Sequence, residues 1–188
     1  MAEPRDWNSM KDMMKRLLVE RTGKDTSYWN AVIKKEKLPD PGSLRSWLKT
    51  RGITGYAQTH LVMETFGYPD YMELKGSELI DEQYRDRQAL RPIYEAVVAA
   101  AVRLGDVTIQ ARKTYVALVT SRRTFARIQP TTRNRLDVAL RLERAKPGGR
   151  LKVSKIQEQM KVQVELMSVE DLDTVVRSLL RSAWMENR

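Results

Sequence analysis

The sequence contains no cysteine and only one histidine, His60. Without cysteine there can be no disulfide, no thiolate zinc site and no cysteine nucleophile. A single histidine excludes metal sites built from several histidines, and any serine–histidine pair would have to use His60. Because His60 stands beside Leu61 and Val62 in a predicted helix, we interpret it as a partly exposed helical residue rather than a general base.

Long apolar runs are also missing. No stretch of about 18 or more apolar residues occurs, so the sequence predicts no membrane-spanning helix and no membrane partner. The segment from Met1 to Asp6 lacks the basic and then apolar pattern of a secretory signal, and we expect a cytoplasmic protein. The length of 188 residues and the hydrophobic content of 41% are sufficient for a packed core.

Acidic residues are scarce in one part of the chain. Residues 87–161 contain 17 lysines and arginines against 5 aspartates and glutamates, whereas residues 1–86 contain 14 of each and residues 162–188 contain 3 against 5. The net charge of +10 is therefore concentrated in the middle segment. Such a segment repels itself when it is packed, which favours a surface that meets a polyanion or an acidic partner.

The first third of the chain has apolar residues at helical spacing, separated by glycine and proline stops. Four helices are predicted, from Asn8 or Ser9 to Gly23, from Thr26 or Ser27 to Leu38, from Ser43 to Gly52, and from Thr54 or Gly55 to Gly67. Short helices joined by short turns are typical of a small bundle. We therefore expect residues 1–70 to form a helical domain, followed by a connector and a short helix over residues 71–86.

Residues 87–188 have a different pattern, in which β-strands follow a helix at residues 89–104. Strands are predicted at residues 114–119, 124–129, 135–142 and 162–166, with a further strand at 107–111 as an alternative. A last helix is predicted after Ser168 as its N-cap, with Leu172, Val175, Leu179 and Leu180 on its inner side. The predicted fold class is α+β, a small all-α N-terminal bundle followed by an antiparallel sheet flanked on one face by two helices.

The strand at 135–142 alternates most regularly. Its apolar positions are Leu136, Val138, Leu140 and Leu142, and the intervening positions are Arg135, Asp137, Ala139 and Arg141. In an antiparallel sheet covered on one side, such alternation predicts one buried face and one face open to water. We therefore expect the arginine-bearing face to be open.

Basic residues of the middle segment fall on this face, on hairpin ends or in the Gly/Pro loop at residues 145–150. The candidate polyanion-binding residues are Arg112, Lys113, Arg122, Arg123, Arg127, Arg133, Arg135, Arg141, Arg144, Lys146, Arg150 and Lys152, with Lys155 beside them. Arginine is favoured at phosphate sites because its planar fork pairs two oxygens. The alternative is a solvated surface whose charge aids solubility, and we favour polyanion binding over it.

The sequence gives little support for a base-stacking surface or for a catalytic metal site. Tyr115 and Phe125, the aromatic residues of the predicted sheet, are interpreted as core residues rather than stacking platforms, so base-specific recognition is not predicted. Asp137 and Glu165 could be neighbours in a metal-dependent nuclease, but we interpret them as ion-pair partners of Arg135, Arg141 or Lys161. No catalytic residue, metal site or cofactor is expected.

Three segments of the predicted sheet domain resemble the C-terminal domain of a bacterial family of unknown function, namely residues 90–94 (LRPIY), 113–118 (KTYVAL) and 125–130 (FARIQP). Residues 21–24 (RTGK), Trp29, and residues 48–49 (LK) to 52–53 (GI) are similar to a helical domain, also of unknown function, that often precedes it. At fold level the sheet resembles frataxin-like and double-wing proteins, which include suspected DNA binders. The resemblance implies two domains and assigns no activity.

We therefore expect a non-catalytic binding protein that holds nucleic acid or another polyanion through arginines of its C-terminal domain. One alternative is a protein-interaction adaptor that docks an acidic protein, since this partner would use the same charge. The other is an enzyme of a type that carries no motif in this sequence. The oligomeric state does not follow from the sequence.

Overall fold

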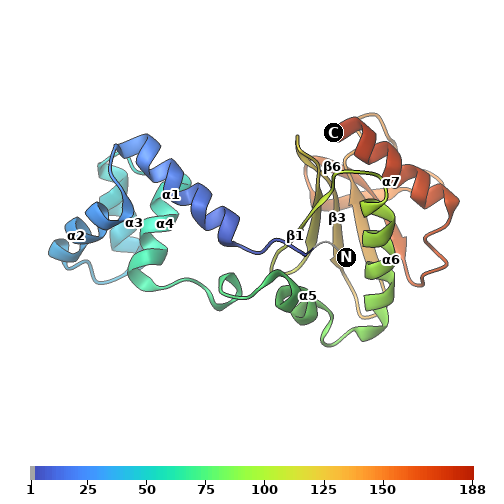
Figure 1. Cartoon of the computed structure of the whole chain (residues 1–188), viewed down its shortest axis with the longest axis horizontal. Helices are drawn as coiled ribbons and strands as arrows, with labels where there is room; N and C mark the ends of the chain where they lie inside the picture. Colours follow the sequence, from blue (N-terminus) through green and yellow to red (C-terminus); the bar gives the residue numbers. More distant parts are fainter. Residues whose placement is uncertain (1–2) are drawn as a thin grey trace. The chain divides into compact units, whose positions relative to one another are not determined.

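A computed structural model, which describes residues 3–188, divides the chain into two compact units (Figure 1). Residues 7–74 form the first, which we call the helical unit. Residues 3–6 and 75–188 form the second, the sheet unit. The chain thus leaves the sheet unit after Asp6 and re-enters it at Lys75, so the helical unit is joined to it by two chain segments.

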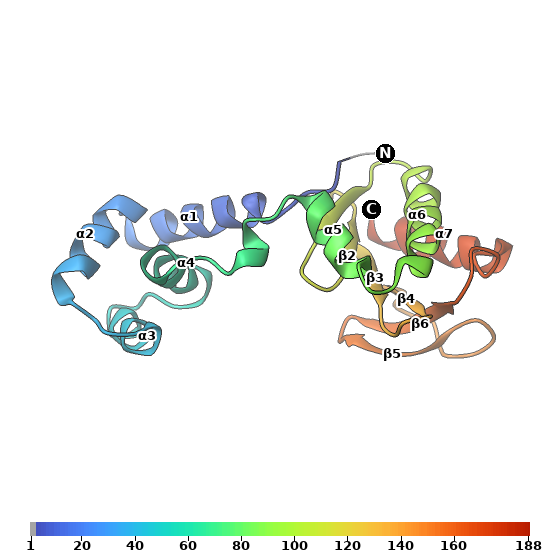
Figure 2. The ribbon, with the colours of Figure 1, turned by 90° about the horizontal axis from the view of Figure 1, so that it is seen from below.

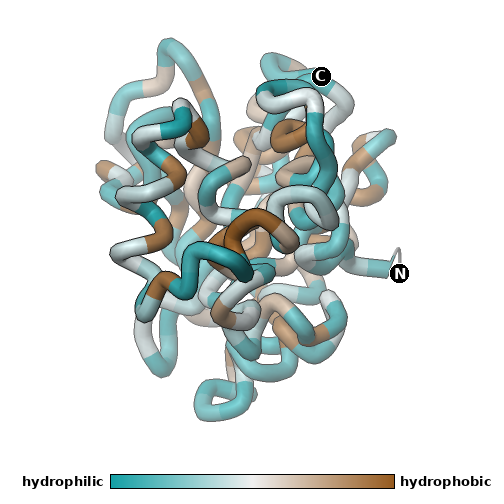
Figure 3. The backbone as a smooth tube through the Cα atoms, turned by 90° about the vertical axis from the view of Figure 1, so that its left-hand side faces the viewer, coloured by the Kyte–Doolittle hydropathy of each residue, from teal (hydrophilic) through white to brown (hydrophobic). Residues whose placement is uncertain are grey.

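The helical unit contains the four predicted helices. They are α1 (Asn8–Thr22), α2 (Thr26–Glu36), α3 (Pro41–Thr50) and α4 (Gly55–Phe66), followed by the 3-10 turn η1 (Asp70–Met72). Figure 3 shows hydrophobic stretches alternating with hydrophilic ones along the chain, as amphipathic helices require. The buried cluster consists of Leu18, Ile33, Leu44, Leu48, Ile53, Ala57, Leu61 and Val62, with Trp29 and Trp47 packed against it.

Aspartates, not the predicted hydroxyl residues, cap the second and third helices. The side chain of Asp25 accepts a hydrogen bond from the backbone N–H of Tyr28 at 2.8 Å, and that of Asp40 accepts one from Ser43 at 2.9 Å. Pro41 then occupies the first helical position, where its missing N–H costs nothing. The predicted starts were therefore one or two residues late, because an aspartate immediately upstream satisfies the first turn better.

The sheet unit contains helices α5 (Gly76–Tyr84), α6 (Arg91–Val102) and α7 (Thr174–Asn187), with the 3-10 turn η2 (Gln88–Leu90) before α6. Its strands are β1 (Thr108–Ala111), β2 (Val116–Val119), β3 (Thr124–Pro130), β4 (Leu136–Leu140), β5 (Lys152–Gln157) and β6 (Met160–Leu166). They form one antiparallel sheet in the order β1-β2-β3-β4-β6-β5. The predicted α+β class is confirmed.

Helices α6 and α7 lie on the same side of the sheet, as Figure 2 and Figure 1 both show. The residues enclosed between them and the central strands are Val97, Val138, Leu140, Val164, Leu172, Val176 and Leu180. Leu140 is completely buried and Val138 is 2% exposed, so the apolar face predicted for this strand is the core face. Because these two helices cover one face of the sheet, we look for binding residues on the other face and at the ends of the sheet.

Strand β5 was not predicted. Its residues are exposed or half-buried, and Lys152, Val153 and Lys155 give it no alternation of buried and exposed positions. It forms the edge of the sheet and pairs only with β6, with an irregular register. An edge strand held mainly by backbone hydrogen bonds carries no hydrophobic pattern, and lysines on it hinder pairing with other chains.

The last helix begins six residues after the predicted cap. Asp173, not Ser168, caps α7 by accepting from the N–H of Val176 at 2.8 Å. Ser168 lies in a turn in which Asp171 accepts from its backbone N–H at 3.0 Å. Packing buries Val176, Leu180 and Ala183, so Val175, predicted on the inner side, is 52% exposed.

Residues 3–6 add a short segment to the edge of the sheet. Arg5 pairs in parallel with β1, donating its N–H to the carbonyl of Ile109 at 2.8 Å and accepting from the N–H of Ala111 at 2.9 Å. Pro4 lies directly against Gly76, the first residue of α5. Within residues 3–188 no helix combines the length and apolar character that crossing a membrane requires.

Candidate functional site

The second face of β4 is not open at its centre, contrary to the sequence-based expectation. Asp137 is 2% exposed and Ala139 is completely buried. Ala139 lies opposite Arg127 of β3 and Gln163 of β6, and Arg127 Nη1 donates to the carbonyl of Ile156 in β5 at 3.5 Å. In the strand order, β4 and β6 lie between β3 and β5. In a flat sheet β3 and β5 would therefore be about three strand spacings of 4.8 Å apart, too far for this hydrogen bond. The β5 end of the sheet must therefore curl over this face.

Arg127 is held in this covered region by an aromatic ring. Its guanidinium carbon lies 3.5 Å from the ring centroid of Tyr115, and Nη2 donates to Gln129 Oε1 at 2.9 Å. Tyr115 is half-buried and stacks on the arginine, so its interpretation as a core residue was wrong, whereas Phe125 is completely buried. Burial lowers the pKa of Arg127, because the charged form loses solvent, and the nearby Tyr115 opposes this shift.

Arg135 pairs with the two acids that could have formed a metal site. Its Nε lies 3.0 Å from Asp137 Oδ1, and its Nη1 lies 3.6 Å from Glu165 Oε1. Thr131 also donates to Asp137 Oδ2 at 2.6 Å. In the described part of the chain no three His, Asp or Glu side chains are grouped so that they could hold a metal ion. The interpretation of Asp137 and Glu165 as ion-pair partners is confirmed for Arg135.

Two further candidate arginines are tied to the protein. Arg112 is 9% exposed and donates to the carbonyl of Ala111 and to Gln110 Oε1, each at 2.9 Å. Arg150 donates to the carbonyl of Asp171 at 2.6 Å, and its Nε lies 3.5 Å from the carboxylate of Asp173. These contacts hold the loop before β5 against the segment before α7. Arg112 and Arg150 thus have structural roles that the sequence did not reveal.

Four other candidates meet at one end of the sheet. Arg122 and Arg123 lie in the turn between β2 and β3, and Arg141 and Arg144 follow β4. Because β3 and β4 are antiparallel, the start of one lies beside the end of the other, and the N–H of Arg141 donates to the carbonyl of Phe125 at 2.9 Å. We call these four residues the arginine cluster.

One carboxylate lies within the arginine cluster. Glu143 Oε1 accepts from Arg123 Nη2 at 2.9 Å. This bond, more than any other contact, holds the pKa of Glu143 below its usual value, and the charges of Arg122 and Arg144 lower it further. Among residues 3–188, Glu143 is thus the acid that forms an ion pair with a guanidinium of the cluster, and it does so with Arg123.

Arg141 has no counter-ion of its own. It is half-buried, and its guanidinium forms no hydrogen bond or ion pair with any residue among 3–188, while its Nε is buried without a partner. Burial lowers the pKa of Arg141, and the adjacent positive charge of Arg123 lowers it further. The charge of Glu143 opposes these two effects only in part, and a bound anion would relieve both.

The end of α7 fixes the backbone of the arginine cluster. Asn187 is completely buried, and its Nδ2 donates to the carbonyls of Arg141 at 2.8 Å and Ala183 at 2.6 Å. Glu186 accepts from the N–H of Glu143 at 3.1 Å, and Thr120 donates to the carbonyl of Asn187. The cluster is thus built on a strand end, a hairpin turn and a helix end.

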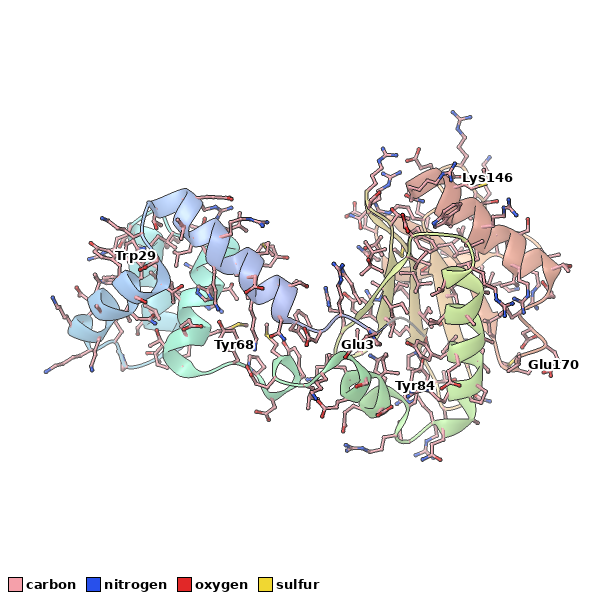
Figure 4. The ribbon with its side chains drawn as sticks, viewed as in Figure 1. Glu3, Trp29, Tyr68, Tyr84, Lys146 and Glu170 are labelled. Atoms are coloured by element: carbon pink, nitrogen blue, oxygen red, sulfur yellow. The ribbon has the colours of Figure 1, made fainter. Side chains whose placement is uncertain are left out.

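The remaining candidates are exposed and lie elsewhere on the sheet unit. Lys113 and Arg133 occupy the β1–β2 and β3–β4 turns, which antiparallel pairing places at the opposite end of the sheet from the cluster. Lys152 and Lys155 lie on β5, and Lys146 projects from the loop before it (Figure 4). No single continuous arginine face is formed.

His60 is a buried residue of the helical unit, not the partly exposed one expected from its sequence neighbours. It is completely buried, and its Nε2 lies 2.8 Å from Thr26 Oγ1. Its Nδ1 lies 3.1 Å from the hydroxyl of Tyr68, which is labelled in Figure 4. The tyrosine is distant enough in sequence that helical periodicity alone could not have revealed this partner.

Comparison with known proteins identifies one part of the chain. Residues 80–187, which span the sheet unit from within α5 to the end of α7, match the model of a protein family described as a domain of unknown function. No curated protein and no solved structure matches the chain. The matched segment includes the LRPIY, KTYVAL and FARIQP segments and all six strands, and it covers more than half of the chain. The chain therefore belongs to the family Domain of unknown function (DUF5655).

Proposed function

We propose that the sheet unit binds nucleic acid or another polyanion without base specificity, and that the arginine cluster is the centre of this surface. Arg122, Arg123, Arg141 and Arg144 bring four positive charges to one end of the sheet. The acids beside them are Glu143, which pairs with Arg123, and Glu186, which accepts from the backbone N–H of Glu143. Guanidinium groups pair phosphate oxygens in a planar fork, and phosphate contacts supply most of the affinity for nucleic acid that lacks a specific sequence.

The observation that carries the proposal is the unpaired guanidinium of Arg141. Arg135 and Arg150 each face two carboxylates, so their charge is satisfied within the protein. Arg141 is half-buried beside Arg123 and forms no ion pair with any residue among 3–188, and the nearby charge of Glu143 only partly offsets its burial and the repulsion from Arg123. A phosphate oxygen at the accessible part of this half-buried guanidinium would accept from it and neutralise the repulsion between the two arginines.

Two features support binding without base recognition. Phe125 is buried and Tyr115 is already stacked on Arg127, so the sheet offers no unoccupied aromatic ring among its described residues for a base. The cluster lies on turns and strand ends rather than on a helix that could enter a groove. Contacts of this kind position a backbone and do not distinguish bases.

The test is a binding titration of the full chain with a DNA duplex and with single-stranded RNA at several salt concentrations. Arg141→Ala combined with Arg144→Ala should weaken binding by about tenfold or more, and the slope of log affinity against log salt should become shallower by about 0.9 for each lost phosphate contact on duplex DNA. The matched control is Arg133→Ala combined with Lys152→Ala, which removes the same charge elsewhere and should weaken binding by about threefold or less.

Equal losses in the two double variants would mean that only total charge matters and would overturn the assignment to the cluster. Failure of the wild-type chain to bind either nucleic acid at low salt would overturn the function itself. That second result would favour the alternative, an adaptor that docks an acidic protein on the same arginines.

A further inference from the structure

A second group of arginines surrounds a hollow between α6 and α7. The hollow has a volume of about 380 Å³ and is lined by Ala100, Arg103, Leu104, Thr174, Arg177, Ser178, Leu180 and Arg181. Three of these side chains are cationic and none is acidic. Two of the three belong to the part of the sequence in which acids outnumber bases, so the charge distribution along the chain gave no indication of this site.

The fold brings the three arginines together from two helices. Arg103 follows the last residue of α6, and Arg177 and Arg181 are four residues apart on one side of α7. Gly105 allows the two elements to approach, because a Cβ at this position would lie 2.8 Å from Trp184 Cζ2 on α7. The spacing of Arg177 and Arg181 was visible in the sequence, but their neighbour Arg103 was not.

The charges of these arginines are not neutralised within the protein. Arg177 Nε donates to the carbonyl of Leu172 at 3.0 Å, which orients the side chain without satisfying its charge. Among residues 3–188, neither Arg103 nor Arg181 forms an ion pair or a side-chain hydrogen bond. Asp173, the acid just before α7, already accepts from Val176 and lies 3.5 Å from Arg150.

The wall of the hollow also contains neutral groups of two kinds. The hydroxyl groups of Thr174 and Ser178 can donate to an anion, whereas Ala100, Leu104 and Leu180 offer an apolar surface. A volume of this size lies in the range of small-molecule sites, which combine an apolar wall with a few convergent polar groups. A ligand that fits has concentrated negative charge at one end and an apolar group at the other.

We propose that this hollow binds a small soluble phosphomonoester, with its phosphate between Arg103, Arg177 and Arg181 and its organic group against Leu104 and Leu180. A phosphate dianion matches three guanidinium groups better than a monocarboxylate does, because it has more charge and three oxygens that accept in-plane pairs of hydrogen bonds. This site is separate from the arginine cluster, which is built on the opposite end of α7.

The experiment uses the full chain and isothermal titration with phenyl phosphate and with inorganic phosphate. The wild-type protein should bind phenyl phosphate more tightly, because only that ligand contacts the apolar wall. Arg177→Ala combined with Arg181→Ala should weaken phenyl phosphate binding by about tenfold or more, since two charge-assisted contacts are lost. The control Arg133→Ala combined with Lys152→Ala removes the same charge from outside the hollow and the arginine cluster and should change affinity by about twofold or less.

A third variant keeps every charge and fills the space. Ser178 is exposed at the rim, and Ser178→Trp should abolish phenyl phosphate binding while thermal melts show an unchanged fold. The proposal is overturned if this variant binds as the wild type does, if both double variants lose affinity equally, or if inorganic phosphate binds as well as phenyl phosphate. It is also overturned if Arg177→Ala with Arg181→Ala weakens duplex DNA binding as strongly, because the site would then hold nucleic-acid phosphate.

Discussion

Arg135 Nε lies 3.0 Å from Oδ1 of Asp137, a residue that is only 2% exposed. The register places Asp137 directly opposite Glu165 on β6, so two carboxylates are neighbours across the strands and repel each other. Arg135 contacts both and offsets this repulsion. An arginine that looked like part of an open binding face therefore stabilises the sheet.

Arg135→Ala should lower the free energy of unfolding. The change leaves the buried Asp137 with Thr131 as its remaining hydrogen-bond donor, and because Arg135 is a third exposed we expect a loss of about 1 to 3 kcal/mol rather than the full value for a buried pair. Chemical denaturation measures it. The matched control Arg133→Ala removes an exposed arginine two residues away and should stay within about 0.5 kcal/mol. Equal stability of the two variants would contradict the structural role.

Asn187 should be as important for the arginine cluster as the arginines themselves. Asn187→Asp keeps the shape of the side chain but replaces its donor by an acceptor, so the carbonyls of Arg141 and Ala183 lose their partner. We expect a loss of about 2 to 4 kcal/mol in a denaturation experiment, because a buried charge is added as well. Met185→Ala, at a position 54% exposed, is the control and should be nearly neutral. A stable Asn187→Asp protein would show that the end of α7 is not anchored as described.

The parts of the fold that the sequence predicted are those with strong periodicity. In β4 the alternation of Leu136, Val138 and Leu140 with polar residues determines the core face, because a shift of one residue would expose all three. Strand β5 has no such pattern, since an edge strand depends on pairing with β6 and not on burial. The prediction of where α7 begins was wrong because Ser168 and Asp173 are both residues that cap helices well, and only packing selects between them.

The sequence predicted that positive charge is concentrated in the sheet unit, but it did not predict which arginines lie close together. The pairing of Arg135 with Asp137 and Glu165 was predicted, but the acids that pair with Arg150 come from the segment before α7, and sequence spacing does not indicate them. The proximity of Arg123 and Arg141 depends on the antiparallel register of β3 and β4. Which arginines are available to a ligand is therefore a tertiary property.

The contact of Pro4 with Gly76 explains why residues 3–6 lie against the sheet unit. A Cβ at Gly76 would lie 2.1 Å from the carbonyl oxygen of Pro4, closer than any real contact, so Gly76→Ala should displace this segment. The N–H of Ala111, which donates to the carbonyl of Arg5, should then exchange its hydrogen faster, and stability should fall by about 1 to 3 kcal/mol. Ser77→Ala, on the exposed side of the same helix, is the control. Unchanged exchange at Ala111 in Gly76→Ala would refute the packing argument.

The hydrogen bonds around His60 determine its protonation. The hydroxyl of Tyr68 donates to Glu64 Oε1 at 2.7 Å, so its oxygen accepts from His60 Nδ1–H. In the neutral form with its proton on Nδ1, Nε2 is an acceptor, and the hydroxyl of Thr26 at 2.8 Å can donate to it. The neutral histidine therefore satisfies both of its ring nitrogens. Burial lowers the pKa of His60 below its usual value of 6.5, and the charge of Glu64 opposes the shift.

A lowered pKa makes the stability of the helical unit depend on pH. Because the folded state holds the proton of His60 less tightly than the unfolded state, the stabilisation is fully present above about pH 6.5 and is lost as the pH falls through the lowered pKa of the folded state. Thermal melts of the full chain between pH 7.5 and pH 5, followed by tryptophan fluorescence, should show the transition of this unit moving to lower temperature. Three of the four tryptophans, Trp7, Trp29 and Trp47, report on it. Since the sequence has no other histidine, His60→Gln should flatten this pH dependence, and the same slope in both proteins would contradict the assignment.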